Sequence, residues 1–182
     1  MTQMKKIPVC LLASILFLLP VKSIPSTDSG EVREFIQTYL AETAQRKFMW
    51  LTGDKKQVSS QILSHSYYKI RVPYWQAENA NRSRTAKTAW VLEEIGKEKL
   101  ITIGVVIEEQ KIQAVRILKF RESRGWEVKL PSFTQQFKGS QLNDKNQLTQ
   151  TVDGISGATL SVRAVTHIAR LALYLQSTLP NP

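Results

Sequence analysis

The apolar positions in the first part of the chain follow two periods, one typical of helices and one typical of strands. Between Glu31 and Arg46 the apolar residues recur every three to four positions, which predicts an amphipathic helix. These residues are Val32, Phe35, Ile36, Tyr39, Leu40 and Ala44. After a break at Gly53 and Asp54, a short second helix is expected to run to Ser64. Residues 67–75 are rich in aromatic and β-branched side chains and predict a strand.

The middle of the chain has a shorter and more regular pattern. Three apolar runs follow one another at Thr88–Ile95, Leu100–Ile107 and Ile112–Phe120. Four-residue segments separate them, and such short connections predict tight turns between antiparallel neighbours in a meander. Residues 77–84, which come before these runs, are polar and basic and are expected to form a loop or a hairpin tip.

The C-terminal third alternates between loops and helical patterns. Residues 121–129 predict a loop, and Pro131 is expected to open a short helical or turn segment that ends at Gly139. After a polar connection, residues 159–177 predict a helix with one apolar face. That face consists of Leu160, Ala164, Ile168, Leu171, Ala172 and Leu175. The whole pattern predicts an α+β fold, in which an antiparallel sheet of four to six strands is flanked by N-terminal and C-terminal helices.

The N-terminus has the features of an export signal. Lys5 and Lys6 form a basic start, and an apolar run over residues 7–21 follows. This run is shorter than the roughly 20 residues that a membrane-spanning helix needs, which favours a signal peptide over a membrane anchor. Cleavage is expected near Ser23, so residues 1–23 would be removed and the mature protein would be periplasmic or otherwise exported.

Charge and cysteine content narrow the function classes. The formal charge of the 182 residues is +10, and removing Lys5, Lys6 and Lys22 with the signal peptide leaves 10 − 3 = +7. Export argues against nucleic acid as a partner and favours an acidic redox partner or an anionic membrane surface, although a basic protein need not have a charged partner. Cys10 lies in the removed segment, so we expect no disulfide and no thiolate metal site.

The segment Asp153–Thr159 carries the most chemistry. Its sequence, DGISGAT, is a loop of small residues that leads directly into the C-terminal helix. Thr159 stands at the expected N-cap, and the N–H groups of residues 160–162 would face a ligand there. A helix N-terminus favours phosphate, because its N–H groups and its dipole attract negative charge. A threonine that only caps the helix is the alternative interpretation.

These residues resemble a known family. Asp153–Thr159 fits the pattern D-x-x-S/T-G-A-T/S of the FMN-binding domain family, which includes the C and G subunits of the sodium-pumping quinone reductase and Rnf complexes. Residues 103–125 resemble the family's strand, turn and strand leading into a Glu-Thr-Pro-Gly loop, and residues 133–140 (FTQQFKGS) resemble its Phe-x-x-Gln-Phe-x-Gly segment. On this basis residues 88–182 are expected to form the FMN-binding domain. Residues 24–87 are expected to form a helical and strand extension packed on its core.

The resemblance implies a covalent cofactor and assigns its neighbours. In the family a flavin transferase takes FMN from FAD and esterifies its phosphate to the last threonine, here Thr159. The residues implied to lie near the phosphate and ribityl chain are Ser156, Gly157 and Ala158. Those implied to lie near the isoalloxazine ring are Glu122, Ser123 and Gly125. Asp153 would be recognised by the transferase, and Arg124 stands where the family usually has proline.

The resemblance also implies a role in electron transport. We expect an exported electron carrier that links a membrane or cytochrome (haem) redox partner to another acceptor. A redox subunit of a larger flavin reductase and a flavin-free binding module are the alternatives. The sequence shows no acid–base pair for substrate chemistry. Candidates for a cation near the ring are Arg116, Arg121 and Arg124, and Trp126 is a candidate for stacking on it; for each of these four, an ordinary surface or packing role is the alternative.

Overall fold

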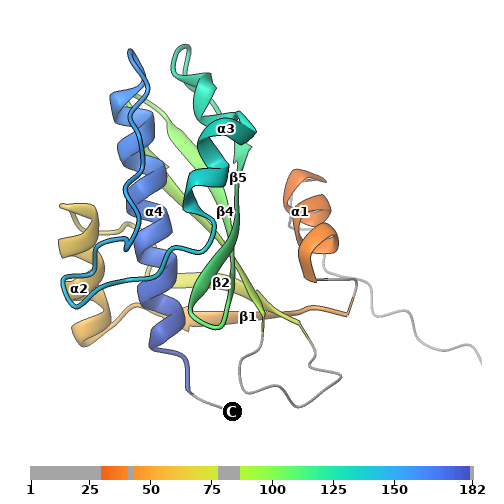
Figure 1. Cartoon of the computed structure of the whole chain (residues 1–182). Coiled ribbons are helices and arrows are strands. Elements are labelled where there is room, and N and C mark those ends of the chain that lie inside the picture. The colour runs from red at the N-terminus through yellow and green to blue at the C-terminus, as the bar shows by residue number, and fades with distance from the viewer. Residues whose placement is uncertain (1–29, 41–42, 78–86, 181–182) are drawn as a thin grey trace, which may run out of the picture.

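A computed structural model describes residues 30–40, 43–77 and 87–180 (Figure 1). The expected signal peptide, residues 24–29 and most of the basic segment 77–84 lie outside the described residues. Within the described ranges, no helix has the length and apolar character needed to cross a membrane.

The centre of the fold is one antiparallel sheet whose five strands lie in the order in which they occur in the chain. The strands are β1 (Gln45–Trp50), β2 (Arg71–Gln76), β3 (Thr88–Ile95), β4 (Leu100–Glu108) and β5 (Lys111–Lys119). At the β4–β5 turn Glu109 and Gln110 have φ of 51° and 59°, as the tightest hairpin turns require. The predicted meander is therefore confirmed, and β1 and β2 extend it on one side.

Helices cover both faces of this sheet. The α-helices are α1 (Gly30–Leu40), α2 (Gly53–Leu63), α3 (Pro131–Thr134) and α4 (Thr159–Ser177), with 3₁₀ helices η1 (Trp126–Lys129) and η2 (Gln135–Phe137) on either side of α3. Figure 1 shows α4 and α1 on opposite sides of the sheet, with α2 beside α4. The expected α+β fold, with a sheet between an N-terminal and a C-terminal helix, is confirmed.

The two faces hold two separate cores, which explains the apolar run of β4. On the α4 side, Trp90 and Ile103 of the sheet and Ile168 of the helix are completely buried. On the α1 side, Phe35 packs so closely on Gly104 that a Cβ there would lie 2.6 Å from its ring. A strand that is buried on both faces has apolar side chains at successive positions, without the alternation of a half-exposed strand.

Two predicted boundaries in the N-terminal part were wrong. Gln45 and Arg46 belong to β1, where they pair with β2, and not to the first helix. Arg46 pairs with Trp75 of β2, and its guanidinium lies over the Trp75 ring at 5.2 Å. These contacts with the sheet decide the conformation of the segment, although its apolar residues have helical spacing. The second strand begins at Arg71 and not at residue 67, because β1 ends at Trp50, opposite Arg71, and residues 67–70 have no strand to pair with.

Candidate functional site

A cavity of about 570 Å³ opens at the N-terminus of α4. Three segments that are distant in the sequence meet there: the β3–β4 turn, the loop after β5 and the loop that leads into α4. The lining residues are Lys97, Glu122, Ser123, Arg124, Gly157, Ala158, Thr159, Leu160 and Ser161. In Figure 1 the loops before α4 and after β5 lie side by side at the upper end of the molecule.

Thr159 is the first residue of α4 and is exposed. The N-cap is Ala158, because its carbonyl accepts the Val162 N–H at 2.9 Å while its own backbone is not helical. The predicted N-cap position of Thr159 was therefore wrong by one residue. The N–H groups available to a ligand are those of residues 159–161, not 160–162. Because Thr159 is the first helical residue and not the N-cap, and no side chain caps this helix end, its hydroxyl has no capping role.

Gly125 joins the loop after β5 to the first turn of α4. Its φ is +83°, and a Cβ added there would lie 2.7 Å from Ser161 Oγ and 3.4 Å from Ala158 Cβ. Glycine is needed at this position both for its backbone conformation and for the space. The structure thus brings the two predicted halves of the site, around Gly125 and around Ala158, into direct contact.

Glu122 binds the β3–β4 turn. Its Oε1 accepts the backbone N–H groups of Lys97, Glu98 and Lys99 at 2.6, 2.8 and 2.9 Å. Slight desolvation alone would raise the pKa of Glu122, but these N–H groups outweigh it and hold the pKa below its ordinary value. Gly96 leaves room for the carboxylate, since a Cβ there would lie 2.7 Å from Oε1. Glu122 therefore fixes the shape of the cavity wall.

The remaining predicted residues fall into two groups. Ser123 and Gly157 line the cavity, as Glu122, Ala158 and Thr159 do. Asp153 and Ser156 are exposed on the approaching loop and do not line it, and the Asp153 N–H donates to Gln136 Oε1 at 2.7 Å. Sequence reasoning missed Lys97, because its place in the cavity depends on contacts between distant segments, and it expected only the N–H of Ser161 to face a ligand.

The three candidate arginines are not equivalent. Only Arg124 lines the cavity. Arg116 lies on β5, 3.7 Å from Glu34 of α1. Arg121 donates to Leu100 O at 2.7 Å and lies 3.7 Å from Glu93. Trp126 is exposed and is not among the residues that line the cavity.

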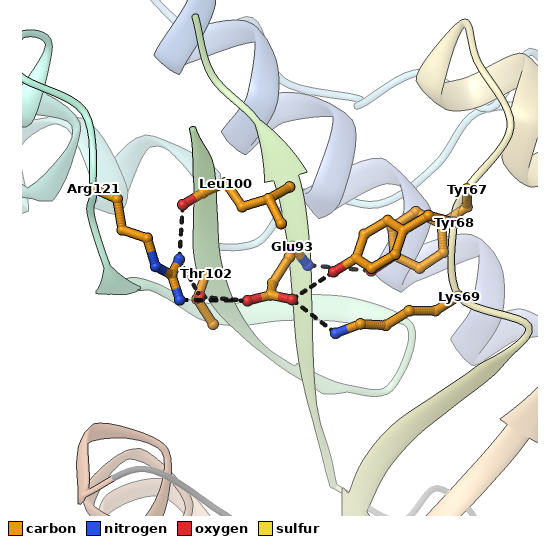
Figure 2. Close-up of polar contacts among 7 residues, drawn as sticks. All are labelled: Tyr67, Tyr68, Lys69, Glu93, Leu100, Thr102 and Arg121. Atoms are coloured by element: carbon orange, nitrogen blue, oxygen red, sulfur yellow. Dashed lines mark hydrogen bonds and ion pairs between the residues drawn. The ribbon is translucent and has the colours of Figure 1, made fainter. Parts of the chain in front are cut away.

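A polar cluster around Glu93 holds the base of the loop that begins at Arg121 (Figure 2). Glu93 Oε2 accepts from Tyr68 at 2.5 Å and from Lys69 at 2.8 Å, and Oε1 accepts from Thr102 at 2.9 Å. Burial alone would raise the pKa of Glu93, but these hydrogen bonds outweigh it and lower the pKa to about 2. The carboxylate is therefore ionised and fully engaged, and Arg121 is held against the sheet.

Comparisons with known proteins agree with this arrangement. The sequence pattern of the FMN-binding domain family matches residues 96–174, which contain all eight predicted site residues. A crystal structure of NqrC from Shewanella oneidensis matches with a TM-score of 0.55 and 15% identity, over 82% of this chain and 85% of that chain. At this identity the likeness shows the fold alone. No curated protein matches the sequence. Residues 96–174 are therefore similar to the FMN-binding domain family, and the chain has a fold similar to that of NqrC.

Proposed function

We propose that this protein is an exported electron carrier with FMN covalently attached through a phosphoester to Thr159. The observation that carries the proposal is the position of Thr159, which is exposed, lines the cavity and begins a helix of 19 residues. The family match over residues 96–174 supports FMN as the ligand.

The residues around Thr159 suit a phosphate diester. The N–H groups of residues 159–161 have no partner within the helix, since a helix leaves its first N–H groups free, and they attract an anion together with the helix dipole. Gly157 has a φ of +79°, and apart from its two neighbours in the chain no residue has an atom within 4 Å of the position where its Cβ would be. A bulky group can therefore reach the hydroxyl from this side.

The cavity suits the rest of the cofactor. Its volume of about 570 Å³ lies within the range of roughly 300–1,000 Å³ that is usual for small-molecule sites. Leu160 offers an apolar surface, and Lys97 and Arg124 offer positive charge. Bound FMN would supply one- and two-electron chemistry. The lining residues include no paired acid and base for processing a substrate, which favours a carrier over a complete enzyme.

The attachment requires a flavin transferase that uses FAD. The Thr159 oxygen would form a bond to the phosphorus of the FMN half, the pyrophosphate bond would break, and AMP would leave. The proton of the hydroxyl would pass to a base of the transferase. Asp153 is exposed on the same loop, and its N–H is bound to Gln136, so this segment is well placed to be recognised by the transferase.

Export gives the covalent bond a purpose. The basic start and apolar run of residues 1–23 favour removal of a signal peptide and delivery to the periplasm or another exported location. A diffusible cofactor would be lost there, whereas one joined to Thr159 stays with the protein. The redox partners that suit this location are membrane or cytochrome proteins. Nucleic acid is not a suitable partner there.

The proposal can be tested by mass. The mature chain is co-expressed with a flavin transferase, purified and weighed intact, alongside Thr159→Ala, Thr159→Ser and the matched control Thr151→Ala. Thr151 is an exposed threonine of the same connection that does not line the cavity. We expect the wild type and the Thr151 variant to gain one FMN less one water, Thr159→Ala to gain nothing, and Thr159→Ser to retain some modification.

Other outcomes of this experiment lead elsewhere. A colourless wild type of unmodified mass would contradict the proposal and favour a flavin-free binding module. A modification that persists in Thr159→Ala would place the flavin on another residue. Steady turnover of a soluble donor and acceptor by the purified, flavin-loaded protein alone would contradict the carrier role and favour a flavin reductase.

A further inference from the structure

Two cationic side chains, Lys97 and Arg124, line the same cavity as Thr159 and enter it from two different loops. We propose that these two side chains raise the midpoint potential of a flavin held in the cavity, an inference that rests on the flavin attachment proposed above. Charge near the ring is one of the means by which a protein tunes a flavin.

The charge balance of the cavity favours this role. Glu122 is the one carboxylate among the lining residues, and its Oε1 is already bound by three backbone N–H groups. Glu98 lies 3.5 Å from Lys97, but the two side chains are 65% and 73% exposed, and such surface pairs are weak. The positive charge of Lys97 and Arg124 is therefore only partly compensated where a ligand would lie.

The positions of the two cations are linked. Glu122 lies two residues before Arg124, and its carboxylate holds the turn that contains Lys97. The close fit of Gly96 against the same carboxylate keeps the turn and the loop together. The main-chain positions from which the two charged side chains extend are therefore held relative to each other.

The other nearby arginines are engaged elsewhere. Arg116 faces Glu34 on α1, and Arg121 faces Glu93 and Leu100 in the cluster of Figure 2. Neither lines the cavity. Arg116 is therefore a matched control: it has the same charge as Arg124, it belongs to the same domain, and its neutralisation should leave the flavin unaffected.

The step that the cations favour is a simple reduction. A chemical reductant such as dithionite supplies two electrons, and solvent supplies one proton, so the reduced flavin carries one more negative charge than the oxidised flavin. A nearby positive charge stabilises the reduced form. In partly solvated surroundings the loss of one such charge is expected to change the ratio of reduced to oxidised flavin about three- to tenfold.

The test is a spectroelectrochemical titration of flavin-loaded protein. Lys97→Gln and Arg124→Gln should each lower the reduced-to-oxidised ratio at a fixed potential by about three- to tenfold, and the double variant by more. For a two-electron couple, tenfold corresponds to about 30 mV. Arg116→Gln should match the wild type, and Lys97→Arg and Arg124→Lys, which keep the charge, should stay close to it. High salt should reduce the differences.

The measured potentials decide whether Lys97 and Arg124 act on the flavin through their charge. Potentials of Lys97→Gln and Arg124→Gln that equal that of Arg116→Gln would overturn the inference. The same holds if the charge-keeping variants shift as far as the glutamine variants, because the effect would then come from altered packing. Intact mass is measured before each titration. A wild type without flavin therefore contradicts the proposed function itself, and a loaded wild type with unshifted variants contradicts only the role of the two cations.

Discussion

Replacing Gly125 with alanine would place a methyl group against the first turn of α4. Two costs add at this position. An alanine at a φ of +83° adopts a left-handed conformation, which costs roughly 1–2 kcal/mol. The new Cβ would also lie 2.7 Å from Ser161 Oγ, and crowding of this kind in a packed region costs roughly 1–3 kcal/mol. We expect Gly125→Ala to lower the free energy of unfolding by about 2–5 kcal/mol in total.

A second substitution separates the two costs. Ser161→Ala removes the oxygen that the new methyl group would strike, so the double variant should recover the steric part and keep only the backbone part. The assay is urea unfolding of the wild type, both single variants and the double variant, treated as a double-mutant cycle with an expected coupling of about 1–3 kcal/mol. A Gly125→Ala variant within about 0.5 kcal/mol of the wild type, or a coupling near zero, would refute the described contact between the loop and the helix.

Two further predictions concern the sheet. Gly104→Ala should lower the free energy of unfolding by about 1–3 kcal/mol, because its Cβ would lie 2.6 Å from the buried Phe35 ring. Adding Phe35→Leu to the same chain should recover part of the lost stability. If it recovers none, the destabilisation does not come from contact with Phe35. Glu93 has its pKa lowered from 4.5 to about 2, so its contribution is complete above pH 4.5 and is lost as the pH falls towards 2. The stability difference between wild type and Glu93→Gln, about 3 kcal/mol at neutral pH, should therefore shrink over this interval in urea titrations, and a constant difference would contradict the assignment.

The elements that the sequence predicts well are those decided by local contacts. The runs that became β3, β4 and β5 are joined by short turns, so each strand pairs with its neighbour in the chain and needs no distant information. Helix α4 begins at Thr159 and ends at Ser177, as its apolar periodicity predicts. The error at Gln45 and Arg46 has the opposite cause, since pairing with Gln76 and Trp75 of β2, which are distant in the chain, decides their conformation.

The candidate site shows the same division. Thr159, Ala158 and Gly157 could be placed together from the sequence because they are consecutive. The contribution of Lys97 depends on Glu122, which binds the turn through main-chain N–H groups, and main-chain contacts leave no mark in the residue types of that turn. The one residue that could have indicated this contact is Gly96, which leaves room for the Glu122 carboxylate. A glycine is equally expected in a turn that binds no carboxylate.

The late position of α4 in the chain has a consequence for the order of assembly. The five strands can pair with their neighbours before the last residues are made, but the cavity has no wall on one side until α4 lies across β3 and β4. The threonine that would receive the cofactor is also the first residue of that helix. Attachment of FMN at Thr159, as proposed, would therefore report a completed fold, because a chain cut before α4 lacks the acceptor hydroxyl, one wall of the cavity and the helix that covers Trp90 and Ile103.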